Sequence, residues 1–210
     1  MKILIAPWGN FRRWEEINYC YEDLEKTSKS SLPLVKEKEN PSKTVIIVSD
    51  TLIDTITNSD ISSYLSLKQK VEKDIVDFCN QSISVVPDNV VVSYGSGEFS
   101  NVKFYGNSMD FYYGVFRELS LLFSQFIREI GEGEEIEVIF DATHGINYTT
   151  LLSYRALREI LEILAYGFSV KLKVLNTDPF VGASKEKGTF NINVIEETRI
   201  LPRIVVYKFT

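Results

Sequence analysis

Residues 135–165 read EIEVIFDATHGINYTTLLSYRALREILEILA, and this stretch decides the fold class. It begins with an apolar run up to Phe140 that is typical of a buried strand, which then ends at Asp141. Apolar side chains recur at helical spacing from Thr149 to Ala165, so we expect a helix there. The inner face of that helix is expected to carry Leu152, Ala156, Ile160 and Ile163. A strand that leads through a short loop into a long helix favours a parallel sheet.

The same alternation of strands and helices extends over most of the chain. Short apolar runs predict further strands at 2–6, 44–49, 90–93 and 170–174. Helical spacing predicts further helices at 61–80 and 111–130. The polar segment 11–43 shows no clear pattern apart from a short helix at 30–38. We therefore expect an α/β fold with a mostly parallel sheet and helices on both faces.

Two further segments complete this expectation. Gly95 to Asn107 is rich in Gly, Ser and Asn, which predicts a loop. Strands at 190–195 and 203–208 follow each other with no helix between them. They are either an antiparallel extension of the sheet or a hairpin used in dimerisation.

Composition and charge exclude several classes of protein. The chain has 210 residues, of which 44% are hydrophobic and 25% charged, so it is expected to fold as one globular domain rather than remain disordered. The net charge of −6 offers no basic field for long nucleic acid, although a few local donors can still hold a small anion. We find no signal peptide and no apolar stretch of membrane length, which predicts a cytoplasmic protein without a membrane partner.

Histidine and cysteine are scarce. The chain has one histidine, so a poly-histidine metal site is excluded, and Cys20 and Cys79 are too few and too far apart for a zinc site. We therefore expect no metal and no cofactor. A reduced, intracellular chain is the simplest interpretation of two isolated cysteines.

Ligands of open α/β sheets bind at the carboxyl ends of the strands, where three loops are unusual. These loops are 8–10, 95–110 and 141–147. The last of them combines Asp141, Thr143, His144, Gly145 and Asn147 before a long helix, which is a plausible cradle for a phosphate or a base edge. In the alternative interpretation, Asp141 or Asn147 merely caps the helix and Gly145 merely fits the turn.

Other candidate residues also allow two interpretations. His144 can act as a general base, because an unperturbed histidine has a pKa of about 6.5, but no nucleophile is placed beside it by sequence. We therefore favour ligand contact or loop bracing for His144. Trp8 can stack on a base or cover the end of the core. Gly95 and Gly97 lack the third glycine of a dinucleotide fingerprint, and the chain has no P-loop motif.

The loop at 141–145 resembles a known family signature. Its sequence Asp-Ala-Thr-His-Gly matches the D-x-T-H-G motif of a CRISPR-associated family named after it. The opening residues 1–10 resemble the start of the same family, in which a Trp-Gly-Asn or Trp-Gly-Asp turn follows the first strand. The Asp-Thr-Leu at 50–52, after the second strand, is similar to that family as well. The resemblance extends over essentially the whole chain.

This resemblance implies a CARF domain, the Rossmann-like sensor of type III CRISPR systems, to which the last two predicted strands add an antiparallel carboxyl-terminal strand extension. Such domains are homodimers that bind a cyclic oligoadenylate, usually cyclic tetra-adenylate, across their twofold axis. A ring with internal twofold symmetry suits an interface that presents each loop twice. Carried over to this sequence, the resemblance implies a ligand pocket lined by Trp8, Gly9, Asn10, Asp141, Thr143, His144, Gly145 and Asn147.

One departure from the family concerns its nuclease. Full-length relatives usually add a HEPN ribonuclease domain with an R-x(4–6)-H motif, but the nearest arginine before His144 is the distant Arg128. We therefore expect no HEPN domain. Residues 1–176 are expected to form the CARF core, and 177–210 a strand pair that completes it or joins the dimer interface. The chain is then either the sensor half of a longer protein or a stand-alone CARF protein.

Three functions follow from this interpretation. The first is a sensor that binds cyclic oligoadenylate. The second is a ring nuclease that cleaves cyclic tetra-adenylate without a metal, by attack of a ribose 2′-hydroxyl on the neighbouring phosphorus. His144 and Ser108 are weak candidates for its catalytic group, because their spacing favours neither. The third, a transcriptional regulator, is disfavoured by the acidic charge and the lack of a winged-helix pattern.

Overall fold

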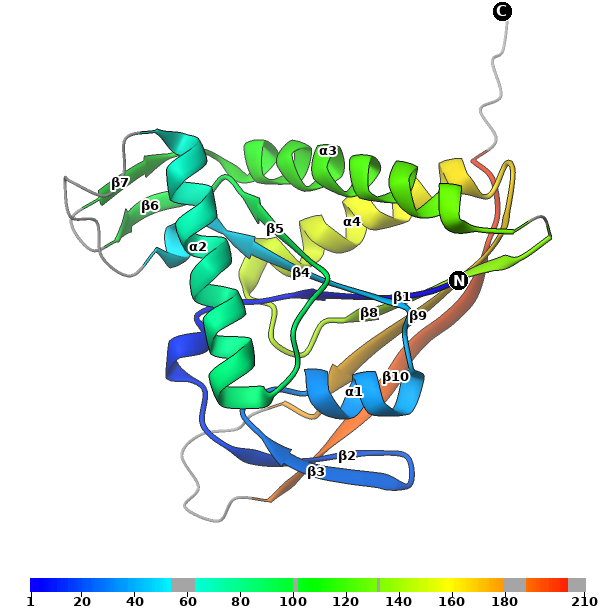
Figure 1. Ribbon diagram of the computed structural model, residues 1–210, viewed down its shortest axis with the longest axis horizontal. Coiled ribbons are helices and arrows are strands. Elements are labelled where there is room, and N and C mark those ends of the chain that lie inside the picture. Colours follow the sequence, from blue (N-terminus) through cyan, green and yellow to red (C-terminus); the bar gives the residue numbers. More distant parts are fainter. Residues whose placement is uncertain (54–62, 100–101, 132, 180–187, 204–210) are drawn as a thin grey trace, which may run out of the picture.

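An eight-stranded sheet forms the centre of the computed structural model, which describes residues 1–53, 63–99, 102–131, 133–179 and 188–203 (Figure 1). In their order across the sheet, the strands are β3 (Leu24–Ser28), β2 (Ile17–Tyr21), β10 (Thr189–Ile200), β9 (Ser169–Thr177), β8 (Glu135–Asp141), β1 (Lys2–Pro7), β4 (Lys43–Ser49) and β5 (Asn89–Ser93).

The strand order has the reversal that defines a doubly wound fold. Strands β5, β4, β1, β8 and β9 are parallel neighbours. From β1 the chain continues to β4 and β5 on one side, and then crosses to β8 and β9 on the other. The reversal lies between β1 and β8, and such a switch point is where ligands bind in open α/β sheets. Because β10 pairs antiparallel with β9, the predicted Rossmann-like sheet with an antiparallel extension is confirmed.

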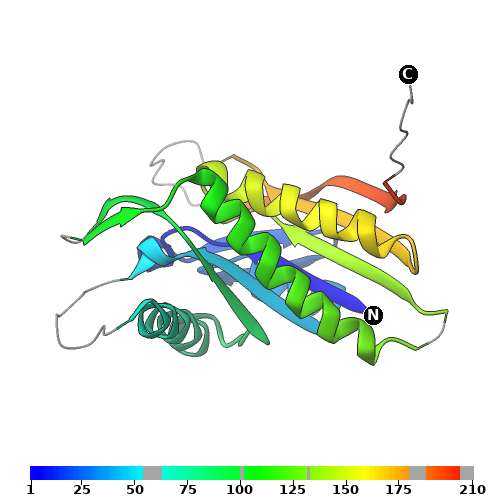
Figure 2. The same cartoon turned by 90° about the horizontal axis from the view of Figure 1, so that it is seen from above.

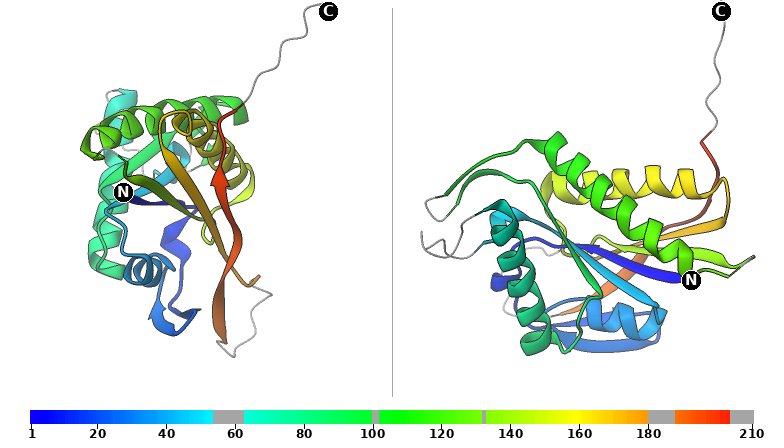
Figure 3. Two further views of the ribbon diagram at one scale, coloured as in Figure 1. Left: turned by 90° about the vertical axis from the view of Figure 1, so that its right-hand side faces the viewer. Right: turned by 45° about the horizontal axis from the view of Figure 1, so that its top comes forward.

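Helices cover both faces of this sheet, as expected (Figures 2 and 3). On one face lie α3 (Ser108–Phe126) and α4 (Asn147–Leu164), side by side, and on the other lie α1 (Leu32–Glu39) and α2 (Tyr64–Phe78). Asn107 begins α3 by accepting hydrogen bonds from two first-turn amides, and the Asp110 carboxylate bonds back to its N–H. None of the helices in the described part of the chain has both the length and the apolarity that a bilayer crossing requires.

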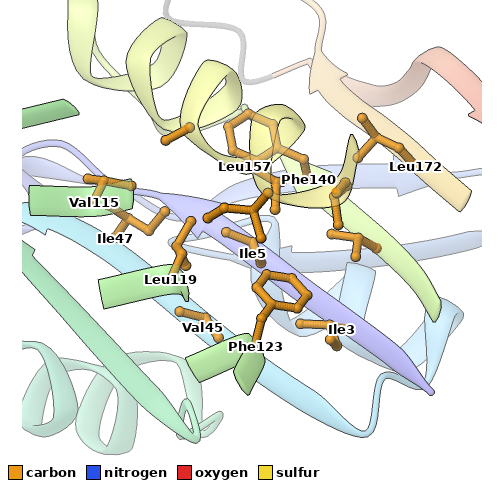
Figure 4. Close-up of a cluster of buried hydrophobic side chains, with 14 of the residues drawn as sticks. Ile3, Ile5, Val45, Ile47, Val115, Leu119, Phe123, Phe140, Leu157 and Leu172 are labelled. Carbon is orange, nitrogen blue, oxygen red and sulfur yellow. The ribbon is translucent and has the colours of Figure 1, made fainter. Parts of the chain in front are cut away.

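The core has two layers, because successive side chains of a strand point to opposite faces. From β1, Ile3 and Ile5 pack against α3 and α4. Figure 4 shows them in one cluster with Phe140 and Leu157. Leu4 and its alternate neighbours belong to the opposite layer, with α1 and α2. Burial on both faces explains why β1, β4 and β8 contain the nearly continuous apolar runs seen in the sequence.

The segment before β4 holds more structure than the sequence indicated. Its strands β2 and β3 form a hairpin, and β2 extends the sheet by pairing with β10. The apolar alternation of Ile17, Tyr19 and Tyr21 in β2 is short and surrounded by polar residues, so it did not stand out in the sequence. The short helix expected at 30–38 is α1, which begins at Leu32 with Pro33 in its first turn, a position that proline tolerates.

The expectation of a loop from Gly95 to Asn107 is wrong. Residues Ser96–Phe99 (β6) and Val102–Tyr105 (β7) form an antiparallel hairpin that projects from the body (Figure 1). Its small and polar residues suggested a loop because the ribbon pairs only with itself and is largely exposed, although Phe104 packs against the core.

Three further details also differ from expectation. Strand β10 runs on to Ile200, beyond the predicted end at 195, with a bulge between Val194 and Glu196. Of the strand predicted at 203–208, Arg203 is not in a strand and 204–208 lie outside the described residues. On α4, Ile163 is 59% exposed, because the buried stripe of this helix passes through Leu161 instead.

Candidate functional site

Two loops meet at the switch point, one after β1 and one after β8. The backbone N–H of Gly9 donates to the carbonyl oxygen of His144 at 2.9 Å, so the two loops are directly joined. A side chain at Gly9 would place its Cβ 2.7 Å from Cγ2 of Ile146, and a Cβ at Gly145 would lie 1.9 Å from Oγ1 of Thr150. Neither position therefore has room for a side chain, because neighbouring side chains approach the backbone closely at both glycines.

Asp141 is a buried carboxylate at the end of β8, only 2% exposed. Its Oδ2 accepts a hydrogen bond of 2.6 Å from the hydroxyl of Ser31, and its Oδ1 accepts one of 3.1 Å from the N–H of Thr143. Burial raises the pKa of this carboxyl, and the hydrogen bonds oppose that shift. Asp141 thus holds its own loop and the start of α1 together.

The imidazole of His144 is engaged inside the protein. Its Nε2 accepts the backbone N–H of Ser31 at 3.1 Å and lies 3.2 Å from the hydroxyl of Tyr19, and its ring packs on Trp14 with 3.9 Å between centroids. An Nε2 that accepts an N–H carries no proton, which assigns the ring proton to Nδ1. Burial lowers the pKa of His144 to about 3, so it is neutral at pH 7.

These contacts bear on the interpretations left open by the sequence. The Trp8 side chain is 3% exposed and packs edge-on against Trp14 and Phe78, as expected for a residue that covers the core. Asp141 does not cap α4, because its bonds go to Ser31 and Thr143. The capping position belongs to Ile146, which has no capping side-chain bond.

Several of the sequence candidates do reach the surface. Asn10 and Asn147 are exposed, one on each loop, while Thr143 and Gly145 are partly buried. Asn147 has a φ of 48°, a left-handed conformation that asparagine tolerates. The exposed polar surface of the two loops is therefore supplied mainly by two amide side chains.

Ser108 lies apart from this network. It is the exposed first residue of α3, and in the described residues it does not form a nucleophile–base pair with His144, whose Nε2 is held by Ser31 and Tyr19. The loop after β4 is also anchored independently. There, Asp50 accepts the N–H of Gly95 at 2.7 Å.

Sequence reasoning missed Ser31, Tyr19 and Trp14. All three come from the polar segment 11–43 and reach the loop after β8 only through the fold, so no local pattern revealed them.

Arginines follow directly after the first loop. Arg12 donates to the carbonyl oxygen of Leu52 and to the carboxylate of Asp74. Its neighbour Arg13 is exposed. Among the described residues, no group of three or more His, Cys, Asp or Glu side chains could hold a metal ion.

A hollow of about 440 Å³ lies between α4 and strands β9 and β10. It is lined by Phe140, Ala142, Asn147, Thr150, Leu151, Tyr154, Val174, Asn176, Ile195 and Glu196. Leu151 and Ile195 are 66% and 60% exposed, so the hollow has an apolar rim that continues from the loop after β8.

Comparison with known proteins gives two matches. The family model described as "CRISPR system endoribonuclease Csx1, CARF domain" matches residues 3–179. A relative from Methanocaldococcus jannaschii with the description "CRISPR system endoribonuclease Csx1" is 38% identical over 207 residues, which cover 96% of this chain and 41% of the relative. The chain thus spans less than half the length of that relative.

Proposed function

This chain belongs to the CARF-domain family of the CRISPR system endoribonuclease Csx1, and on that basis we propose that it is a sensor of cyclic oligoadenylate, with cyclic tetra-adenylate as its ring. The CARF domain of this family supports a sensor role in type III CRISPR defence. The ring itself, its contacts and the homodimer are part of the proposal.

One observation carries it: two joined loops at the switch point expose an amide side chain each. Asn10 follows β1, Asn147 follows β8, and the bond between Gly9 and His144 fixes the two loops to each other. Asparagine amides pair with the N6 and N7 edge of adenine. A ring of adenylates therefore finds base-reading groups at the edge where ligands of this fold bind.

The proposal divides the candidate residues into two roles. Asn10, Asn147 and the backbone at Gly145 contact the ring. Trp8 and His144 hold the loops from within, as does Asp141, because their side chains are already engaged by protein groups. Phosphates of the ring are held by the exposed guanidinium of Arg13 and by the first-turn amides of α4.

A twofold ring calls for two copies of this site. We assign the dimer interface to the face of α4 and β10, where the exposed Leu151 and Ile195 flank the hollow. This face begins at the ligand loop itself, because α4 starts at Asn147. Two copies that meet there bring the loops after β1 and β8 of both chains to one ring.

The state of His144 favours a sensor over a ring nuclease. A general base must be free to take a proton near neutral pH. His144 has a pKa of about 3, and its Nε2 already accepts a hydrogen bond from Ser31.

The test is calorimetry of the purified chain with cyclic tetra-adenylate, followed by chromatography of the nucleotide. One intact ring bound per two chains is the expected result. Release of linear di-adenylate would replace the sensor by the ring nuclease, and no binding of tetra- or hexa-adenylate rings would reject the proposal.

A further inference from the structure

Ser31 makes two hydrogen bonds to the loop after β8, although it lies 110 residues earlier in the chain. Its hydroxyl donates to Oδ2 of Asp141 at 2.6 Å, and its backbone N–H donates to Nε2 of His144 at 3.1 Å. Ser31 is fully buried, so water does not compete for its hydroxyl.

The position of Ser31 before α1 predicts a capping role that its hydroxyl does not have. Ser31 directly precedes α1, where a serine side chain commonly accepts a hydrogen bond from a first-turn amide. It makes no such capping bond, and the N–H of Leu32 donates to Oγ of Ser30 instead. The hydroxyl of Ser31 therefore serves Asp141 rather than its own helix.

Asp141 depends on this donor. Its carboxylate is buried, and it accepts the Ser31 hydroxyl on one oxygen and the Thr143 N–H on the other. A buried carboxylate that loses a donor must reorient or take up a proton. Either response moves the loop whose His144 carbonyl holds Gly9, so both loops of the switch point respond.

We propose that Ser31 is a positioning residue of the ligand site: it fixes Asp141 and His144, and through them both loops, without touching the ring. The inference rests on the proposed function in the test that measures affinity for the ring. It assigns a role in ligand binding to the segment 11–43, which lies outside the two loops.

The test is a double-mutant cycle read by calorimetry with cyclic tetra-adenylate. Ser31→Ala is expected to weaken binding by about tenfold, as for the loss of a hydrogen bond to a charged group. Because Ser31 acts through Asp141, adding Ser31→Ala to Asp141→Asn is expected to weaken binding by less than about threefold more. Ser93→Ala is the matched control, since it removes another buried hydroxyl bond, of 2.9 Å to the Phe111 carbonyl, and should keep wild-type affinity.

Unchanged affinity in Ser31→Ala, an equal loss in Ser93→Ala, or full additivity with Asp141→Asn would overturn the inference. If the wild-type chain binds no ring, the proposed function fails instead. The nitrogen spectrum of His144, the only histidine, then decides the positioning role without ligand. Ser31→Ala is expected to shift its ring resonances and Ser93→Ala to leave them in place, and the absence of that difference would reject the role.

Discussion

The backbone N–H of Gly9 donates to the carbonyl oxygen of His144 across 2.9 Å, which ties the loop after β1 to the loop after β8. These loops lie at the reversal of strand order, which is where ligands bind in open α/β sheets. Because the bond joins main-chain atoms, a side-chain substitution in either loop removes neither its donor nor its acceptor. What a substitution can disturb is the close packing around it.

Gly145→Ala should disrupt the loop after β8. The new Cβ would lie 1.9 Å from Oγ1 of Thr150, so the loop must shift, and we expect a loss of about 1–3 kcal/mol in unfolding free energy together with weaker ring binding. Gly167→Ala is the control, because no atom lies within 4 Å of its added Cβ. Urea denaturation and calorimetry measure both effects. Equal stability and affinity in the two variants would show that the loop does not need its glycine.

Removal of the exposed amides should weaken the ring complex and leave the fold intact. We expect Asn10→Ala and Asn147→Gly each to reduce affinity by about tenfold, since each deletes a base-reading amide. Glycine is the correct replacement at Asn147 because the backbone there has a φ of 48°. Asn80→Ala, at an exposed position near the end of α2, is the control. If both loop variants bind like this control, the assignment of ring contacts is wrong.

Arg13→Ala should reduce the salt dependence of binding as well as its strength. An exposed guanidinium that contacts a phosphate contributes an attraction that added salt screens. Calorimetry at low and high salt measures this, and we expect a shallower decline of affinity for Arg13→Ala than for the wild type. Arg128→Ala provides the comparison, because it lies beyond the far end of α3, opposite to Ser108. A salt dependence equal to that of the wild type would remove Arg13 from the site.

The strand–loop–helix from β8 to α4 was predictable because its periodicity is local. Apolar residues recur at strand spacing in β8 and at helical spacing in α4, which predicted both elements although Ile163 is exposed, and the D-x-T-H-G loop lies between them. The hairpin of β2 and β3 was not predictable in this way, since it pairs polar residues such as Asn18 and Thr27. The buried contacts that hold the site could not be predicted from the sequence either. Ser31 and His144 are 113 residues apart, and only the completed fold brings them into contact.

His144 should stay neutral across the physiological range. With a pKa of about 3 in the folded state, against about 6.5 when unfolded, it takes up its proton only after unfolding at intermediate pH. The unfolded state then binds more protons, so stability falls as pH drops from about 7 towards 3, by at most about 1.4 kcal/mol per pH unit from this group. Nitrogen spectra of labelled histidine should show one Nδ1-protonated ring from pH 5 to 8. A midpoint near 6.5 would contradict the internal bonds of His144.

Leu151→Asp should prevent dimerisation and, with it, ring binding. Leu151 is 66% exposed on α4 beside the hollow, so an aspartate there costs the isolated chain little, but it places a charge in an apolar contact between copies. Leu121→Asp, on α3 and 46% exposed, introduces the same charge outside the proposed interface and should leave the dimer intact. Sedimentation velocity reports the oligomer, and calorimetry reports the ring. A Leu151→Asp chain that remains dimeric and binds one ring per two copies would place the twofold axis on another face.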